Sequence, residues 1–337
     1  MTELVLVAES GDGTVSALNL QTDGTAHLNR LATSPVGDGC GTFAVDARRD
    51  LVYAAAKGEP AQLVTLRLDR ASGELTETSR RAVDDSLTYL ELTHDGSVLL
   101  GASFGGGFAA SWQVGDDGTV GEPRSRVEFA NAHCVVAAGP YAYVVSLGED
   151  LVAQFSVAPG GALTPLDPPT VACPEGSGPR HLVLAGSNAY LVTEYSAEAI
   201  RFDVADDGTL TAAESVRIDD PAANLAHSRM GADPLEEHLR WGADLHVARG
   251  FLLCSERTAS TIASVALDAD GRLGQVVSIS GTETQPRGFV VTPDERLAIA
   301  AGERSTHLRL HRVEDDGRLV PVERVAIGAK ANWVRVV

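Results

Sequence analysis

Hydrophobic residues along this chain come in short runs that are separated by turn-forming residues. Residues 176–210 show the pattern: apolar runs at 181–185, 188–193 and 199–204 are followed by a turn at Asp207-Gly208. Runs rich in Val, Leu, Ile, Tyr and Phe between Gly, Asn, Asp and Ser are typical of β-strands joined by tight turns. This stretch therefore predicts consecutive antiparallel strands.

The same four-strand pattern repeats along the whole chain. The turn before its fourth strand recurs seven times, with glycine at positions 24, 73, 118, 161, 208, 271 and 317. Successive glycines lie 43 to 49 residues apart, except for one interval of 63 residues. A period of this length is characteristic of four-stranded propeller blades. Since no copy sustains an amphipathic helical period, we predict an all-β, seven-bladed β-propeller with four antiparallel strands per blade.

The two ends of the sequence together supply one more copy of the unit. The N-terminal segment provides three strands before the first full copy, and residues 332–337 read as a lone first strand. We therefore predict a single domain over residues 1–337, closed by a composite blade of one C-terminal and three N-terminal strands. The surplus of the long interval lies at about 220–242, a polar segment with two prolines, which we expect to be an insertion loop over one face.

Composition and charge limit the classes of partner. The formal net charge is −19 and is spread along the chain, so we expect neither nucleic acid nor anionic membrane as a partner. The four cysteines follow no metal-binding spacing, and no apolar run approaches the roughly 18 residues of a membrane span. With no secretory signal at Met1, we expect a cytoplasmic protein. An anionic small molecule would need a local cluster of arginines.

Ionisable residues recur at two equivalent positions of the repeat, where first strands begin and where second strands end. These positions belong to one face of a propeller, so their side chains can meet there. The beginnings of first strands hold His133, Arg180, His181, Asp244 and Arg287, and the ends of second strands hold Lys57, Glu194, Arg257 and Glu303. Because side chains alternate along a strand, we expect His181 to point away from Arg180 and to have a structural role.

Three stretches carry a resemblance to a known family: GPRHL with YLVTE, WGADL with LLCSER, and QPRGFVVTPDERLAIAAGE. They resemble the seven-bladed lactonase family, which includes bacterial 6-phosphogluconolactonases and fungal carboxymuconate lactonizing enzymes. The family's proposed active-site residues fall on His133, Arg180, Glu194 and Arg257 of this chain. Ser146 and Thr193 replace an aspartate and an asparagine that are usual in the family, which bears on the substrate rather than on the reaction class.

The resemblance implies a lactone hydrolase that needs no cofactor and no metal and acts on a small anionic sugar lactone. Arg180 and Arg257 would bind the substrate and stabilise the oxyanion, while either His133 or Glu194 would move the proton. Further candidate substrate contacts are Arg287, Asp244 and Glu303.

Two alternatives stay open at this point. One is a cycloisomerase that closes a carboxylated muconate, and the other is a non-enzymatic propeller that binds proteins. Metal-dependent six-bladed lactonases are disfavoured, because a cation site should not be surrounded by guanidinium groups.

Overall fold

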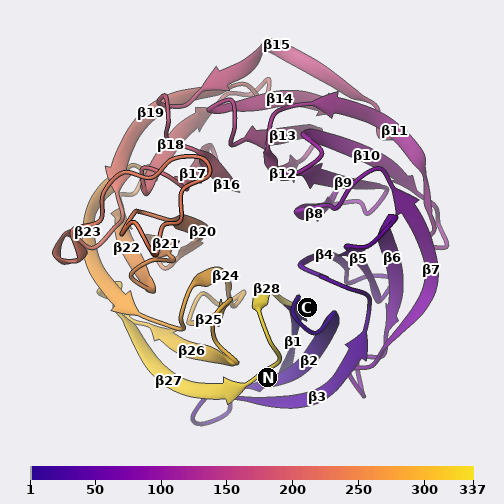
Figure 1. Cartoon of the computed structure of the whole chain (residues 1–337), viewed down its shortest axis with the longest axis horizontal. Coiled ribbons are helices and arrows are strands. Elements are labelled where there is room, and N and C mark those ends of the chain that lie inside the picture. Colours follow the sequence, from indigo (N-terminus) through magenta and orange to yellow (C-terminus); the bar gives the residue numbers. More distant parts are fainter. Residues whose placement is uncertain (1) are drawn as a thin grey trace.

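The computed structural model describes residues 2–337, which form seven sheets arranged in a ring (Figure 1). Each sheet has four antiparallel strands, of which the first lies nearest the axis of the ring. The prediction of an all-β, seven-bladed propeller is therefore confirmed.

The seven blades have the following strands, from the axis outward. Blade 1 contains β28 (Ala331–Val336), β1 (Thr2–Glu9), β2 (Thr14–Gln21) and β3 (His27–Pro35). Blade 2 contains β4 (Thr42–Asp46), β5 (Leu51–Ala56), β6 (Ala61–Leu68) and β7 (Leu75–Val83). Blade 3 contains β8 (Tyr89–Leu92), β9 (Val98–Ser103), β10 (Phe108–Val114) and β11 (Val120–Glu128). Blade 4 contains β12 (Ala132–Ala138), β13 (Tyr141–Ser146), β14 (Leu151–Val157) and β15 (Leu163–Ala172). Blade 5 contains β16 (Pro179–Ala185), β17 (Asn188–Thr193), β18 (Glu198–Val204) and β19 (Leu210–Arg217). Blade 6 contains β20 (Gly242–Ala248), β21 (Phe251–Glu256), β22 (Thr261–Leu267) and β23 (Leu273–Gly281). Blade 7 contains β24 (Pro286–Val291), β25 (Leu297–Gly302), β26 (His307–Val313) and β27 (Leu319–Ala326).

Packing between neighbouring blades explains the apolar runs of the sequence. In blade 5, all six residues of β17 are buried, because the adjacent blades cover both faces of this strand. The outer strand β19 has only Leu210 buried, since one of its faces meets solvent. The core thus lies between neighbouring blades, and the outermost strand of the blade is the one that meets solvent.

Six of the seven repeated glycine turns, all except the one at Gly24, approach the preceding blade closely on the face opposite the first-strand entries. All seven of these glycines have positive φ. At Gly208, an added Cβ would lie 2.5 Å from the ring of Tyr141 in the preceding blade, and the carbonyl accepts a hydrogen bond of 2.7 Å from the Tyr143 hydroxyl. Glycine is therefore required at this position by both the backbone conformation and the close approach of the preceding blade.

The composite blade closes the ring as the sequence predicted. Strand β28 pairs with β1 in antiparallel register from Val5 and Val336 to Glu9 and Ala331. Its Trp333 is buried, and the indole Nε1–H donates a hydrogen bond of 2.9 Å to the carbonyl of Phe43 in blade 2. The C-terminal strand therefore completes blade 1 and connects it to blade 2.

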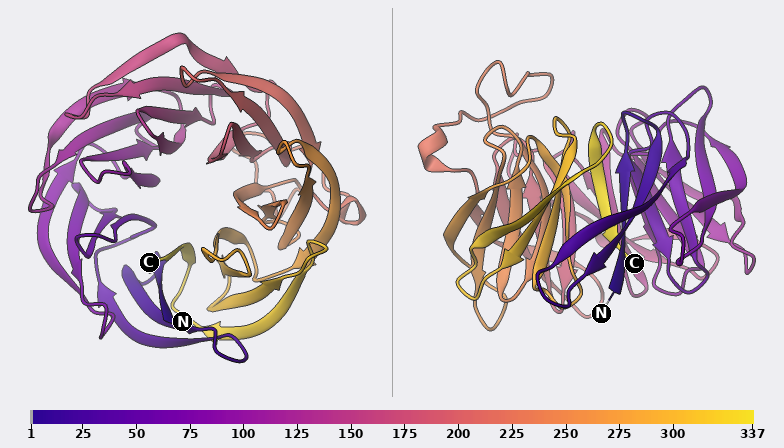
Figure 2. Two further views of the ribbon diagram at one scale, coloured as in Figure 1. Left: turned by 180° about the vertical axis from the view of Figure 1, so that it is seen from behind. Right: turned by 90° about the horizontal axis from the view of Figure 1, so that it is seen from below.

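The long interval between glycines corresponds to a loop between β19 and β20. It contains a single turn of 3-10 helix, η1 (Pro221–Ala223), whose cap is the Asp220 carboxylate. The loop rises above the ring on the face opposite the two chain termini (Figure 2). Within residues 2–337 there is no helix with the length and hydrophobicity that a membrane span requires.

Buried histidines make the stability of this fold sensitive to acid, and His311 in β26 allows a test. Its side chain is fully buried, and burial lowers its pKa to about 4. Between pH 6.5 and 4 the unfolded chain therefore binds a proton that the folded protein does not, so the free energy of unfolding falls as the pH falls. His311 should contribute roughly 3 kcal/mol to this loss.

We expect His311→Gln to reduce the difference in unfolding free energy between pH 7 and pH 5, measured by urea denaturation. Glutamine can keep a hydrogen bond to Thr282, whose hydroxyl lies 3.0 Å from Nε2 of the imidazole. The free energy of unfolding of the variant at pH 7 shows how much stability is lost through packing alone, because His311 is mainly neutral at that pH in both the folded and the unfolded parent. An acid dependence equal to that of the parent would contradict this account.

Candidate active site

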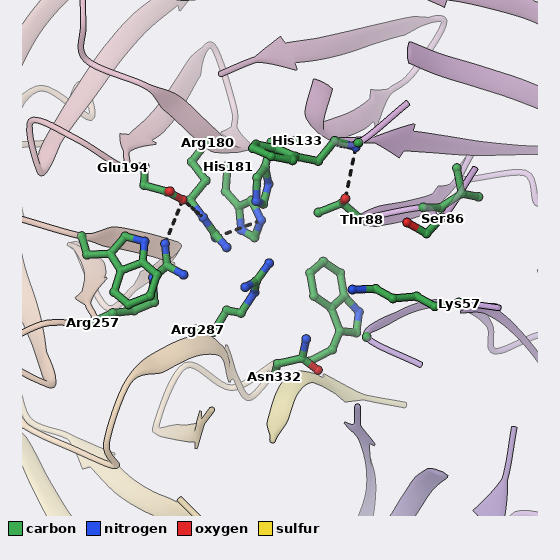
Figure 3. A pocket seen from close by; sticks show the side chains of 16 residues that line it. Lys57, Ser86, Thr88, His133, Arg180, His181, Glu194, Arg257, Arg287 and Asn332 are labelled. Atoms are coloured by element: carbon green, nitrogen blue, oxygen red, sulfur yellow. Dashed lines mark hydrogen bonds and ion pairs between the residues drawn. The ribbon is translucent and has the colours of Figure 1, made fainter. Parts of the chain in front are cut away.

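A cavity of about 400 Å³ opens at the centre of the face on which the first strands begin (Figure 3). It is lined by side chains from all seven blades and by the end of the insertion loop. Its polar and aromatic lining residues are Lys57, Ser86, Thr88, Phe104, His133, Arg180, His181, Glu194, Trp241, Arg257, Arg287, Asn332 and Trp333. The four residues implied by the family resemblance therefore share one cavity.

A β-bulge at the start of the first strand recurs in five blades and positions much of this lining. The pairing register shifts by one residue in blades 1, 4, 5, 6 and 7, but not in blades 2 and 3. The extra residue of four of these bulges is Asn332, His133, Arg180 or Arg287. A bulge turns a side chain out of the regular alternation. The same local irregularity thus delivers four polar side chains to the cavity.

The bulge also makes the expected orientation of His181, away from Arg180, wrong. Because Arg180 is the extra residue, His181 resumes the pairing opposite Val192 and contributes to the cavity lining together with Arg180. Its ring packs edge-on against Tyr89 and Trp333, with centroid distances of 5.2 and 6.0 Å. His181 therefore forms the floor of the cavity with these aromatic residues.

Arg180, Glu194 and Arg257 form one buried ion-pair group on one wall of the cavity. Oε2 of Glu194 accepts hydrogen bonds of 2.8 Å from Nε of Arg180 and from Nη2 of Arg257. Arg180 also donates from Nη1 to the carbonyl of Ala243, and the Arg257 guanidinium stacks on Trp241 at 3.7 Å from the ring centroid. Both arginines are thus held in fixed orientations.

Electrostatics keep this group ionised. Burial alone would raise the pKa of Glu194, but the charges of Arg257, Arg180 and Arg287 outweigh it and lower the pKa. Burial lowers the pKa of Arg257 to about 9, against the opposing effect of Glu194, so the guanidinium is cationic at neutral pH. The wall carries two positive charges and one negative charge.

The two histidines of the cavity are neutral at physiological pH. Burial and the charge of Arg180 lower the pKa of His133 well below its usual value, and the same two causes lower the pKa of His181 to about 4. Nδ1 of His181 lies 2.9 Å from Asp244, while Nε2 lies 3.2 Å from Nη1 of Arg180. His181 therefore donates to Asp244 and accepts from Arg180. Both of its nitrogens are engaged.

His133 has a different environment. Its Nδ1 is buried without a hydrogen-bond partner among residues 2–337, which leaves Nε2 as the nitrogen that can face a ligand. Its ring contacts Phe104 and His181, with centroid distances of 5.9 and 5.1 Å. This imidazole is neutral, and no polar group in the described part of the chain holds it.

Three further candidates from the sequence occupy different places. Arg287 lines the cavity and pairs with Glu303 at 3.3 Å, but Glu303 itself is not part of the lining. Asp244 lies behind His181 and also accepts a hydrogen bond of 3.1 Å from the backbone N–H of Phe289. Both carboxylates therefore contact cavity residues rather than the cavity.

Several lining residues were not proposed from the sequence, although signals for some of them exist. Asn332 and Trp333 occupy the same positions in blade 1 as Arg180 and His181 in blade 5, so aligning the lone last strand with the other first strands would have found them. Trp241 belongs to the insertion loop and has no counterpart in the repeat. Ser86 and Thr88 precede the first strand of blade 3, where sequence alone gives no comparable signal.

The two departures from the family pattern lie outside the cavity lining. Ser146 is buried and donates a hydrogen bond of 2.7 Å to the carbonyl of Ala130. Thr193 is buried as well and shares a hydrogen bond of 2.6 Å with Ser196. Their hydroxyl groups support the backbone around the site.

The chemistry of the donor groups does not suit a metal ion. Glu194 is the one carboxylate that lines the cavity within the described part of the chain, and its Oε2 is already shared by two arginines. No group of three or more His, Cys, Asp or Glu within residues 2–337 is arranged to hold a metal. The four cysteines are buried free thiols.

Comparison with known proteins shows which family has this fold. The family described as "Lactonase, 7-bladed beta-propeller" matches residues 4–336. The chain belongs to this family. Curated relatives include the 6-phosphogluconolactonase of Sodalis glossinidius, 28% identical over 347 residues, with 100% of this chain and 99% of the relative covered. The 6-phosphogluconolactonase of Pectobacterium carotovorum is 29% identical over 285 residues, with 82% and 81% covered.

Solved structures of the same fold include the periplasmic gluconolactonase of Pseudomonas aeruginosa, with a TM-score of 0.88 and 22% identity, covering 100% of this chain and 99% of that one. A protein from Lactobacillus plantarum has the same TM-score at 19% identity, and both chains are covered completely. The resemblance seen in the sequence is thus confirmed at the level of the family. The cytoplasmic location stays a prediction.

Proposed function

We propose that this protein hydrolyses a small anionic sugar lactone, with 6-phosphogluconolactone as the leading candidate. The observation that carries the proposal is the pair of buried arginines fixed by Glu194 beside the unpaired imidazole of His133. The relatives named 6-phosphogluconolactonase support the choice of a lactone over a muconate.

The arginine pair can stabilise the charge that develops during hydrolysis. Nη2 of Arg180 and Nη1 of Arg257 form no hydrogen bond with any residue that the structure describes, so these N–H groups are free to bind the lactone carbonyl oxygen. When water attacks the carbonyl carbon, the oxygen becomes an oxyanion, and fixed cationic donors stabilise it without having to reorganise.

His133 is placed to move the proton. Its free Nε2 would take a proton from the attacking water while the carbon–oxygen bond to that water forms. The resulting imidazolium would return the proton to the ring oxygen as the bond between this oxygen and the carbonyl carbon breaks. The product is the open-chain hydroxy acid, which contains all the atoms of the lactone and of the water. Glu194 then acts as a positioning residue that orients both arginines.

The test is a substrate panel followed by acid release with a pH indicator. We expect the protein to accelerate hydrolysis of fresh 6-phosphogluconolactone above the spontaneous rate, in proportion to protein concentration, and to keep this activity after exhaustive EDTA treatment. A sample without protein controls for spontaneous opening of the lactone. Turnover of carboxymuconate alone would indicate the cycloisomerase, and loss of activity with EDTA that calcium restores would indicate a metal-dependent enzyme.

A further inference from the structure

We propose that Lys57, together with Ser86, Thr88 and Asn332, binds the anionic group of the substrate at the end of the cavity opposite the arginine pair. This inference rests on the proposed lactonase function and specifies how its substrate is oriented. Figure 3 shows Arg180, Glu194 and Arg257 on one side of the cavity, with Lys57, Ser86 and Thr88 facing them from the other side.

The charges of the cavity single out Lys57. Arg180 and Arg257 share Glu194, and Arg287 pairs with Glu303. Lys57 is the one cationic side chain in the cavity lining that forms no ion pair with an acidic residue in the range 2–337. Its ammonium group is therefore a full, uncompensated positive charge on a wall that has no carboxylate, and an anionic ligand is the natural counter-ion.

The backbone of Lys57, an exposed residue, is held by a glycine-rich connection between β3 and β4. The backbone N–H of Lys57 donates a hydrogen bond of 2.7 Å to the carbonyl of Asp38. Its aliphatic stem passes so close to Gly39 that a Cβ there would lie 2.9 Å from Cδ of the lysine. Gly39 also has a positive φ of 61°. The connection thus makes room for the side chain on its way into the cavity (Figure 3).

Neutral donors line the same cavity as the ammonium group. Thr88 accepts a hydrogen bond of 3.2 Å from the backbone N–H of Phe104, so its hydroxyl hydrogen is free to donate elsewhere. The Ser86 hydroxyl and the Asn332 side-chain amide line the same cavity and form no hydrogen bond within the described chain. Two hydroxyl donors, an amide donor and one lysine in the same cavity match the acceptor oxygens of a phosphate group.

The two walls together can hold one substrate at two points. In a 6-phosphorylated sugar lactone, the carbonyl carbon and the carbon that carries the phosphate-bearing chain both flank the ring oxygen, and their substituents point in diverging directions from the ring. With the phosphate at Lys57, the carbonyl can face Arg180, Arg257 and His133, where the chemistry is proposed. A cavity of about 400 Å³ is within the range of small-ligand sites. The substrate class is therefore the phosphorylated lactone rather than its neutral counterpart.

The experiment compares 6-phosphogluconolactone with unphosphorylated gluconolactone for the parent, Lys57→Gln and Lys57→Arg. For Lys57→Gln we expect kcat/KM for the phosphorylated lactone to fall by about 10- to 100-fold, mainly through KM, because a charged hydrogen bond is lost. The value for the neutral lactone should change less than about twofold, and Lys57→Arg should recover part of the loss. The matched control is Lys330→Gln, which removes the chain's other lysine, an exposed residue outside the cavity lining.

Calorimetric titration with 6-phosphogluconate and with gluconate separates this inference from the proposed function. If the parent hydrolyses neither lactone, the proposed function fails, but tighter binding of 6-phosphogluconate that Lys57→Gln abolishes would still support the anion site. Equal losses for both lactones in Lys57→Gln, or no loss for either, would overturn the inference. A larger phosphate-specific loss in Arg287→Gln than in Lys57→Gln would overturn it as well.

Discussion

Replacing Arg180 with alanine is expected to lower kcat/KM for the lactone by on the order of a hundredfold or more, the scale observed when one oxyanion donor is removed. The loss should appear mainly in kcat, because the free Nη2 of this arginine is proposed to bind charge that develops only in the transition state. Arg257→Ala should behave in the same way. Initial rates over a range of lactone concentrations, corrected for spontaneous hydrolysis, measure both parameters.

Arg180→Lys should recover little of this activity. Arginine donates from Nε to Glu194, from Nη1 to Ala243 and to His181, and still has Nη2 for the substrate. A single ammonium group cannot reach all of these positions. Poor recovery of activity in Arg180→Lys would show that the planar, multiple-donor geometry of the guanidinium group is needed. Full recovery would show that only its positive charge matters.

Arg201→Ala is the matched control for lost stability. Arg201 is also a buried arginine of blade 5, and it pairs with Asp203 and Glu214 on β18 and β19, outside the cavity lining. We expect this variant to lose stability but to keep kcat. If Arg180→Ala and Arg257→Ala fold normally and turn over lactone as fast as the parent, the arginine pair is not an oxyanion site.

The ring of blades could be predicted from the sequence because its repeating element is local. Each repeat needs a residue with positive φ at the same tight turn, and glycine meets this need at all seven positions. The meeting of Arg180, Glu194 and Arg257 was predictable for a related reason. Antiparallel pairing brings Arg180, in the first strand of blade 5, close to Glu194 after the second, and Arg257 holds the equivalent place to Glu194 in the neighbouring blade.

The orientation of His181 could not be predicted, because it depends on a bulge of one residue. Period-two alternation holds only while pairing is regular, and the extra residue Arg180 interrupts it. No residue type in GPRHL marks the irregularity. The recurrence of the bulge in five blades becomes visible only when the pairing partners are known, and it is also what links Asn332 to the other cavity residues.

Lys57 illustrates a different limit of sequence analysis. Its place at the end of a second strand could be read from the repeat, but its lack of an acidic partner could not. That property depends on which carboxylates the other blades direct into the cavity. It distinguishes Lys57 from Arg287, which also lines the cavity but has Glu303 beside it.

The sequence also left open whether His133 or Glu194 is the general base, and the structure supplies a physical distinction. Protonating Glu194 would remove the negative charge between two buried guanidinium groups, so the carboxylate serves best if it stays ionised throughout the reaction. His133 has no such partner, and its Nε2 is free. His133 is therefore the better general base, because it can accept a proton while Glu194 keeps its negative charge between the two arginines.

We therefore expect His133→Gln to lower kcat by about 10²- to 10⁴-fold with little change in melting temperature. Glu194→Gln should lower kcat less than this but should destabilise the fold by roughly 3–5 kcal/mol, because it leaves two buried arginines without a counter-charge. The pH dependence of kcat/KM provides an independent readout. The pKa of His133 is lowered well below 6.5, and a general base must be in its neutral form to accept a proton. For the parent protein, kcat/KM should therefore stay level as the pH falls through 6.5 and should decrease only at more acidic pH. His133→Gln should lose this acidic limb, while Glu194→Gln should retain it. The opposite pattern, with the limb and most of kcat lost in a well-folded Glu194→Gln and kept in His133→Gln, would assign the base to Glu194.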